Sequence, residues 1–401
     1  MNLSEVFKGF YLKNQEERKK LILDVLKETG VSLTEDEISS IFDSVKALDK
    51  LSDKFIENAT GYHGLPLGVA TNFKVNDKEY LVIPMAVEES SVIAAASHGA
   101  KLALGGGGFF ATSSDPIMTG QVEIFHEGRK EQFINLYEAN KNYIIDIIKN
   151  ATESLEKRGG GFRRIEIKEI KEIDTFVIEF DLDTRDAMGA NIINTVAEKI
   201  GNFIRTALGF DVGLQILTNL CLGRMARSYC KIPVKSLGTS TYGGLDVAER
   251  IVKAYKFAYH DQKRATTHNK GVMNGIDPLV IATGNDWRAV ESAAHSYAAI
   301  SGRYLPLTKW FISDCKNFLV GEIELPLSLG TVGGMTKLHP GCMAVLKVLG
   351  MPSSKELCEI TASVGLAQNL TALKALATEG IQKGHMALHQ KNLDLLKGKK
   401  V

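Results

Sequence analysis

Apolar and polar positions follow two different periods along this chain. In residues 16–28 and 34–48 the apolar side chains recur every three or four positions, which predicts an amphipathic helix in each segment. Thr34 followed by Glu37 is the signature of a capping box, so the second helix is expected to begin there. Residues 365–381 are small or apolar all round, which predicts a helix buried on every side.

Residues 116–218 change period several times and form a recognisable unit. Strict alternation of apolar and polar residues predicts strands, and the longer period predicts helices. The expected order is a strand at 120–125, a helix at 132–157, strands at 163–170 and 174–182, a helix at 190–208 and a strand at 212–219. This βαββαβ order is the ferredoxin-like pattern. After residue 219 the chain is expected to return to the body formed by its first part.

Three shorter segments connect these units. Residues 78–85 read as one strand, and residues 90–104 as a helix whose small side chains allow close packing against another backbone. The glycine run at 105–110 does not follow the GxGxxG dinucleotide-binding pattern after a strand. We therefore interpret it as a hinge that leads into the second unit.

Charged residues and glycines are interleaved with apolar residues between 264 and 288. Three glycines and a proline argue against an ordinary surface helix, so the apolar run 278–283 predicts a buried strand or helical turn with polar groups at both ends. Lys270 and Asp286 are the natural pair, because a lysine beside a carboxylate stays charged and can polarise a carbonyl oxygen. The alternative is a solvated Lys270 and an Asp286 that caps a helix beginning at Trp287.

Two other segments offer candidate chemistry. Glu88 and Glu89 precede a predicted helix, where a carboxylate either stabilises the helix dipole or, if buried, has a raised pKa and donates a proton. The turn at 186–191 contains Gly189, and free N–H groups at the start of a helix favour phosphate, although purely structural turns share this composition. His385 near the end of the chain is equally well explained as an exposed surface residue.

Composition narrows the class of protein. The 401 residues are 44% hydrophobic, enough for two or three domains with their own cores. With 48 basic and 47 acidic residues, the balance favours neither nucleic acid nor a polybasic membrane contact. We expect a cytoplasmic protein, since no signal peptide or membrane-spanning run is present. The five cysteines lack CxxC spacing, which predicts buried thiols and no metal site.

Five segments, in the same order, resemble class II hydroxymethylglutaryl-CoA (HMG-CoA) reductases. They are residues 57–73, 84–97, 183–198, 265–291 and 365–389. The resemblance implies an α+β fold: a large mixed α/β substrate-binding domain, an inserted ferredoxin-like cofactor-binding domain and a short C-terminal helical flap. The corresponding boundaries are 1–115 and 219–380 for the large domain, 116–218 for the small domain and 381–401 for the flap. In the family the flap continues further beyond the position of His385.

The resemblance also implies an activity. The family reduces HMG-CoA to mevalonate and CoA with two reduced nicotinamide cofactors, in the mevalonate pathway of isoprenoid biosynthesis. Its catalytic residues align with Glu89 as proton donor, Lys270 at the oxyanion, Asp286 as their positioning group and His385 as the acid for the CoA thiolate. Substrate contacts align with Ser91, Asn219, Arg264, Asn274 and Asn369. A homodimer with the active site between subunits is implied, possibly assembled into a higher oligomer.

The cofactor contacts are carried over in the same way. They fall on Asp186, Met188, Gly189, Ala190 and Asn191. NADH-preferring members place an aspartate where this chain has Thr152, so the departure favours NADPH, with NADH possible. Two alternatives remain: oxidation of mevalonate with NAD in a catabolic direction, and a non-catalytic CoA- or nucleotide-binding relative.

Overall fold

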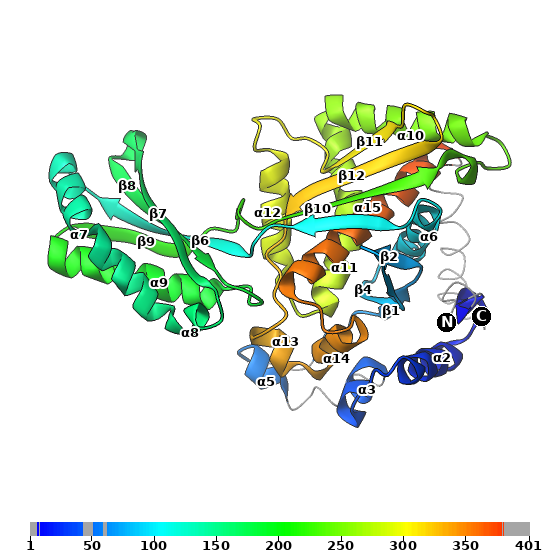
Figure 1. Cartoon of the computed structure of the whole chain (residues 1–401), viewed down its shortest axis with the longest axis horizontal. Coiled ribbons are helices and arrows are strands. Elements are labelled where there is room, and N and C mark those ends of the chain that lie inside the picture. Colours follow the sequence, from blue (N-terminus) through cyan, green and yellow to red (C-terminus); the bar gives the residue numbers. More distant parts are fainter. Residues whose placement is uncertain (1–5, 8, 43–50, 59–61, 379, 381–401) are drawn as a thin grey trace.

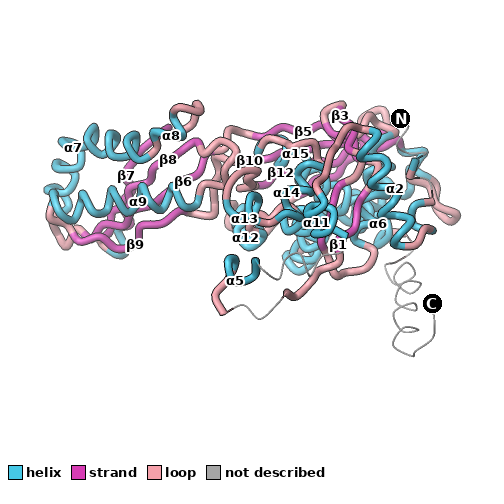
Figure 2. Tube along the Cα trace, turned by 90° about the horizontal axis from the view of Figure 1, so that it is seen from below, coloured by secondary structure: helices cyan, strands magenta, loops and turns pink. Residues whose placement is uncertain are grey.

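The computed structural model describes residues 6–7, 9–42, 51–58, 62–378 and 380. Two bodies lie side by side along the long axis of the molecule (Figure 1; Figure 2). The smaller body is built on a four-stranded sheet and the larger on a six-stranded sheet, and each encloses its own hydrophobic core. The mixed α+β architecture predicted from the sequence is therefore the one observed.

The six-stranded sheet gathers strands from distant parts of the chain. Its order is β11 (Thr308–Ile312), β12 (Phe318–Pro326), β10 (Met225–Pro233), β5 (Phe109–Ser113), β2 (Phe73–Val75) and β3 (Lys78–Tyr80). Neighbouring strands are antiparallel except β2 and β5. Buried and exposed residues alternate along β10, as expected for a sheet with one covered face.

A long central helix covers that face. Helix α15 (Ser354–Ala377) crosses the sheet and packs against α11 (Gln262–Ala282) and α6 (Val92–Leu104) (Figure 1). It is buried over most of its surface, as predicted, but it begins earlier than the sequence pattern indicated, at a capping box formed by Ser353 and Glu356. The other main elements of the large body are β1 (Leu67–Ala70), β4 (Ile83–Ala86), α10 (Gly244–His260), α12 (Trp287–Ala298), α13 (Gly334–Leu338) and α14 (Pro340–Val348).

The small body has the predicted βαββαβ order. Its elements are β6 (Ile117–Phe125), α7 (Lys130–Ala151), α8 (Glu153–Glu156), β7 (Gly161–Ile170), β8 (Thr175–Asp183), α9 (Ala190–Phe203) and β9 (Asp211–Leu217). The sheet order is β7-β8-β6-β9, with antiparallel neighbours throughout. This is the ferredoxin-like topology. The chain leaves the large sheet after β5 and rejoins it at β10, and the exact domain boundaries stay a prediction.

The amino-terminal helices also agree with the pattern. Helix α2 (Gln15–Glu28) occupies the first predicted segment, and α3 (Glu35–Phe42) begins the second. The Thr34 backbone N–H donates to Glu37 Oε2 (2.7 Å) and the Glu37 N–H donates to Thr34 Oγ1 (3.2 Å), so the predicted capping box is confirmed. Residues 43–50 lie outside the described residues.

Residues 78–85 do not form the single strand that was predicted. They divide into β3 and β4, which belong to different sheets: Tyr80 pairs with Phe73, and Ile83 pairs with Ala70. Pro84 helps to explain the division, because proline has no N–H for a sheet ladder and is confined to short or edge strands. Here it lies in a two-stranded sheet. An apolar run alone does not reveal such a corner.

The glycine run at 105–110 is not a hinge between the two bodies. It forms the tight turn from α6 to β5, within the large body, and Gly107 has a φ of 100°. A Cβ on Gly106 would collide with the Lys231 carbonyl oxygen, so this glycine allows two backbones to touch. The chain passes to the small body later, between β5 and β6.

Helix α11 is continuous over 21 residues, although its glycines and Pro278 predicted a break. Tertiary packing explains the difference at Gly275, where a Cβ would lie 2.8 Å from Gln368 Cβ and 2.9 Å from the Val364 carbonyl oxygen. This glycine lets α11 and α15 approach closely. The helix ends only at Gly284, whose φ of 70° suits a residue just past a helix terminus.

This contact gives a stability prediction. The substitution Gly275→Ala is expected to lower the free energy of unfolding by about 1–3 kcal/mol, because the methyl group overpacks the interface between α11 and α15. Gly271→Ala is the matched control in the same helix, since nothing lies within 4 Å of its added Cβ. There we expect a gain of about 0.5–1 kcal/mol from helix propensity. Denaturant unfolding of both variants checks the pair, and equal losses would contradict the packing explanation.

Two other features bear on the class of protein. Among the described residues, no helix is long and apolar enough to cross a membrane.

Four cysteines are buried as predicted, but Cys315 is exposed. Within the same ranges, no group of three or more histidine, cysteine or acidic side chains is arranged to hold a metal ion.

Candidate active site

An ion pair joins α11 to the segment before α6. Lys270 Nζ donates to Glu89 Oε2 at 2.7 Å, and the two side chains are 59% and 39% exposed. The predicted partner of Lys270, Asp286, is therefore not the partner observed. Ser91 lies two residues beyond Glu89 with a φ of 72°, and its hydroxyl does not cap α6. The structure thus brings Glu89, Lys270 and the neighbouring Ser91 to one exposed region.

Asp286 lies at the other end of α11. Its Oδ1 accepts hydrogen bonds from the backbone N–H groups of Arg288 (3.0 Å) and Ala289 (3.2 Å), so it caps α12, as the alternative interpretation proposed. Ala282, the last residue of α11, lies twelve positions beyond Lys270. At the rise of an α-helix this is about 18 Å. Lys270 and Asp286 of one chain therefore cannot form a pair.

A large cavity opens beside the Lys270–Glu89 pair. Its volume is about 1220 Å³, and Glu89 and Ser91 form part of its wall. The same cavity extends to basic side chains on α2 and α6, namely Arg18, Lys19, His98 and Lys101. Burial, reinforced by nearby lysines, lowers the pKa of His98, which favours its neutral form. The wall also carries Glu16 and Glu88, so a long ligand fits the size of this space with its anionic groups beside the basic side chains.

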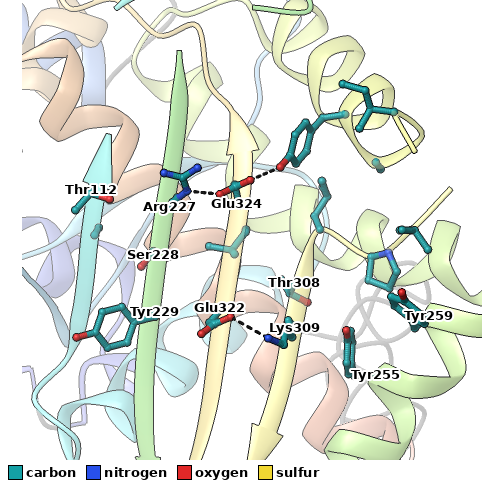
Figure 3. Close-up of a pocket in the computed structure, with 18 of the residues that line it drawn as sticks. Thr112, Arg227, Ser228, Tyr229, Tyr255, Tyr259, Thr308, Lys309, Glu322 and Glu324 are labelled. Atoms are coloured by element: carbon teal, nitrogen blue, oxygen red, sulfur yellow. Dashed lines mark hydrogen bonds and ion pairs between the residues drawn. The ribbon is translucent and has the colours of Figure 1, made fainter. Parts of the chain in front are cut away.

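A second cavity, of about 680 Å³, lies on the face of the six-stranded sheet that α15 does not cover (Figure 3). Its floor carries two ion pairs, between Arg227 and Glu324 and between Lys309 and Glu322, and Tyr255 and Tyr259 form one wall. None of the predicted site residues lines it. We therefore place the candidate active site at the Lys270–Glu89 cavity.

Two of the predicted substrate residues lie on α11 with Lys270. Asn274 is half-buried one turn further along, and Arg264 is half-buried nearer the start of the helix. Burial lowers the pKa of the Arg264 guanidinium. The adjacent His268 is buried and its pKa falls to about 3, so it is neutral at physiological pH. The positive charges on this segment of α11 are therefore Lys263, Arg264 and Lys270, and of these Arg264 is the half-buried one.

Asn369 does not reach the candidate site. Its side chain is 1% exposed, and its Oδ1 accepts hydrogen bonds from Thr308 Oγ1 (2.9 Å) and Trp310 Nε1 (2.8 Å). The structure thus gives it internal contacts between α15 and β11, and the predicted substrate contact stays a prediction. Asn219 is exposed at the end of β9, in the small body.

A titratable cluster that the sequence did not indicate joins α11 to α12. Burial and the neighbouring Glu291 raise the pKa of Asp277, which favours its protonated form. A hydrogen bond from His295 lowers the pKa of Glu291, and the same contact raises the pKa of His295. His295 Nδ1 in turn lies 2.6 Å from the Tyr304 hydroxyl oxygen. These groups connect α11 to α12, the two helices on either side of the turn that contains Asp286.

The predicted cofactor turn connects β8 to α9. Gly189, with a φ of 99°, precedes α9, and a Cβ there would collide with the Thr184 side chain. The N–H groups in the first turn of α9, which includes Ala190 and Asn191, have no partner within the helix and can bind an anion. Met188 and Asp186 are half-buried beside them. A dinucleotide phosphate therefore fits this turn.

The turn is attached to the large body by groups that the sequence did not single out. Asp186 Oδ1 accepts a hydrogen bond from the Ser354 N–H (2.8 Å), so this carboxylate also has a structural role. The buried Arg224 donates to the carbonyl oxygens of Ala187 (3.2 Å) and Met188 (3.1 Å) and to Ser354 Oγ (2.7 Å). The partners of Arg224 lie in three separate segments, at 184–188, 329 and 354, so no local sequence pattern reveals them.

Thr152 does not face a cofactor. Its side chain is fully buried, and its hydroxyl donates to the Ile148 carbonyl oxygen at 2.9 Å, within the same helical segment. The buried side chain gives no physical basis for inferring NADPH preference from this position, and the assignment of Thr152 to the cofactor site stays a prediction. His385 lies outside the described residues, so its predicted role stays a prediction.

The two halves of the site define a class of protein. An anion-binding turn suits a dinucleotide, and an exposed Lys–Glu pair beside a large cavity suits a carbonyl substrate whose oxygen gains negative charge. This combination is expected of a dinucleotide-dependent oxidoreductase.

Comparison with known proteins gives the family. Residues 14–390 match the sequence profile of hydroxymethylglutaryl-coenzyme A reductase. The chain is 42% identical over 400 residues to the 3-hydroxy-3-methylglutaryl-coenzyme A reductase of Archaeoglobus fulgidus, covering 99% of this chain and 88% of that one. The class II enzyme of Streptococcus pneumoniae, solved bound to NADPH, has a TM-score of 0.85 at 36% identity, covering 93% of this chain and all of that one. The chain belongs to the hydroxymethylglutaryl-coenzyme A reductase family, and the predicted family and fold class are confirmed.

Proposed function

We infer that the protein is an HMG-CoA reductase of the mevalonate pathway, as its family membership indicates. One HMG-CoA, two NADPH and two protons give mevalonate, free CoA and two NADP⁺. The observation that carries this inference is the Lys270–Glu89 pair at the wall of a cavity large enough for an acyl-CoA. The basic side chains Lys19 and Lys101 at the far part of the cavity suit the CoA phosphates.

The roles of the polar residues follow from their charges. Lys270 is a cation held at the cavity, and it would stabilise the negative charge that develops on the carbonyl oxygen of the substrate. Glu89 lies in hydrogen-bond contact with Lys270 and would return protons to the reduced oxygen. Arg264, on the same helix, would hold the free carboxylate of the substrate. His385 would protonate the departing CoA thiolate.

Asp286 and the cofactor turn require a second subunit in this mechanism. Both lie at the carboxyl-terminal end of α11, about 18 Å along the helix from Lys270. We propose an isologous homodimer in which Asp286 and the turn at 186–191 of one subunit face Lys270 and Glu89 of the other. Two-fold symmetry then completes both sites at once.

The residues around Gly189 fit a dinucleotide, which would supply the hydride for each reduction. The α9 N-terminus would bind its phosphates, and Asp286 of the same subunit would approach the partner's catalytic pair. We propose NADPH as the preferred form, supported by its presence in the Streptococcus pneumoniae relative.

Oxidation of NADPH and NADH by the purified protein, each with HMG-CoA, tests this function. We expect turnover that depends on HMG-CoA, yields mevalonate and is faster with NADPH. A preference for NADH would overturn the cofactor assignment. Exclusive activity with mevalonate, CoA and NAD⁺ would favour the catabolic alternative, and no turnover in either direction from a folded dimer would favour the non-catalytic one.

A further inference from the structure

One asparagine beside the proposed catalytic Asp286 binds a distant backbone segment with both ends of its amide. Asn285 Oδ1 accepts a hydrogen bond from the Gly330 N–H at 2.7 Å, and Asn285 Nδ2 donates to the Gly330 carbonyl oxygen at 3.0 Å. The same Nδ2 also donates to Thr283 Oγ1 at 3.0 Å. The amide therefore satisfies both backbone groups of Gly330, as a neighbouring strand would.

Gly330 in turn lies directly against the cofactor turn. A Cβ on Gly330 would be 2.5 Å from the Met188 nitrogen and 3.2 Å from the Ala187 carbonyl carbon. The next residue, Thr331, donates its backbone N–H to the Asp186 carbonyl oxygen at 2.8 Å. The segment that Asn285 holds is thus in backbone contact with the residues that precede α9.

These contacts form one continuous connection from Asp286 to the cofactor turn. Asn285 is the chain neighbour of Asp286, which caps α12, and its own backbone N–H donates to the Val280 carbonyl oxygen at 3.0 Å. The peptide that carries the catalytic carboxylate is therefore fixed at the end of α11. From there two hydrogen bonds reach Gly330, and Gly330 supports the peptide between Ala187 and Met188.

We propose that Asn285 is a positioning residue that sets the cofactor turn relative to Asp286. The proposal rests on the proposed function, and it concerns the half of the site that one subunit presents to its partner. Loss of either amide bond would free the segment around Gly330 from α11. The turn that binds the dinucleotide would then lose one of its supports and keep those of Arg224 and Ser354. The cavity around Lys270 and Glu89, at the other end of α11, would be unchanged.

The variant N285D tests the proposal, because it keeps the shape of the side chain. Its carboxylate still accepts from the Gly330 N–H but repels the Gly330 carbonyl oxygen. We expect the dissociation constant for NADPH, followed by the fluorescence of the reduced cofactor, to rise at least about tenfold, as the loss of one buried amide hydrogen bond predicts. The KM for NADPH should rise with it and kcat should fall. The KM for HMG-CoA should stay within about twofold, since the change costs nothing at the distant cavity.

Asn76 provides a matched control. It binds Ala111 in the same two-bond manner, with both bonds at 2.8 Å, in the large body at the second cavity. It also donates to Glu359 Oε2 at 3.1 Å, so N76D adds a repulsion and should destabilise the fold at least as much as N285D. A merely structural role for Asn285 predicts that both variants lower Tm and that neither changes NADPH binding. Our proposal predicts weakened binding in N285D alone.

Other outcomes are equally decisive. Unchanged NADPH binding by folded N285D, or equal weakening in both variants, would overturn the inference. If N285D does not fold, N285A removes the amide without adding charge and is judged by the same measurements. A wild-type protein that binds NADPH but does not reduce HMG-CoA would overturn the proposed function, whereas the binding difference between N285D and N76D would still decide the role of Asn285.

Discussion

Replacing Lys270 by alanine is expected to lower kcat for HMG-CoA reduction by about a hundredfold to a thousandfold, the range for loss of a single oxyanion-stabilising group. The reason is that Lys270 is held by Glu89, which lies in the wall of the proposed substrate cavity, and it pairs only with Glu89 among the described residues. Its side chain is 59% exposed, so the substitution opens no core cavity and Tm should change little. NADPH oxidation at saturating substrate measures the loss directly.

Lys309 is the matched control for this prediction. It is 60% exposed and pairs with Glu322 at 3.7 Å, but it lies at the second cavity and not at the candidate site (Figure 3). Lys309→Ala should therefore retain kcat within about twofold, since removing an exposed ion pair has small effects. Near-normal turnover in Lys270→Ala, or equal losses in both variants, would refute the oxyanion role.

Mixing two inactive variants is expected to restore activity. If Asp286 acts on the Lys270 of the partner subunit, K270A and D286A each produce a dimer in which both sites are defective. In a mixed dimer, the two defects fall in one site and the other site is intact. Mixed dimers purified through two different tags should then recover about half of the wild-type activity, because each carries one good site of two. A steady-state assay of the purified mixed dimers measures the recovery.

The combination of K270A with E89Q is the control for this experiment. Lys270 and Glu89 form their ion pair within one chain, so each site of a mixed dimer would lack one of them. No recovery is expected. Failure of K270A and D286A to restore activity, in mixed dimers that are shown to form, would contradict the shared site. Recovery with both combinations would contradict the assignment of Glu89 to the same subunit as Lys270.

The sequence predicted much of the fold because its signals are local. The alternation and helical periods within 116–218 were sufficient for the ferredoxin-like order, and Thr34 with Glu37 was sufficient for a capping box. The same reasoning failed for α11, where Gly275 was read as a break. Gly275 packs against residues of α15 that lie about ninety positions away in the sequence. Local propensity cannot anticipate such a packing partner.

For the candidate site, too, local features could be predicted from the sequence, whereas long-range contacts could not. Residue type and short spacing indicated Lys270, the Glu88–Glu89 pair and the turn around Gly189 as candidate chemical groups, and the family resemblance selected Glu89. Only the tertiary structure decided which of them meet: Lys270 pairs with a carboxylate 181 positions away, and Asp286 is kept from it by the length of α11. The roles of Thr152 and Asn369 were carried over from the family resemblance, and only the structure shows which internal groups these buried side chains contact. Backbone periodicity is a property of neighbouring residues, whereas the partner of a charge and the direction of a side chain depend on the packing of the whole chain.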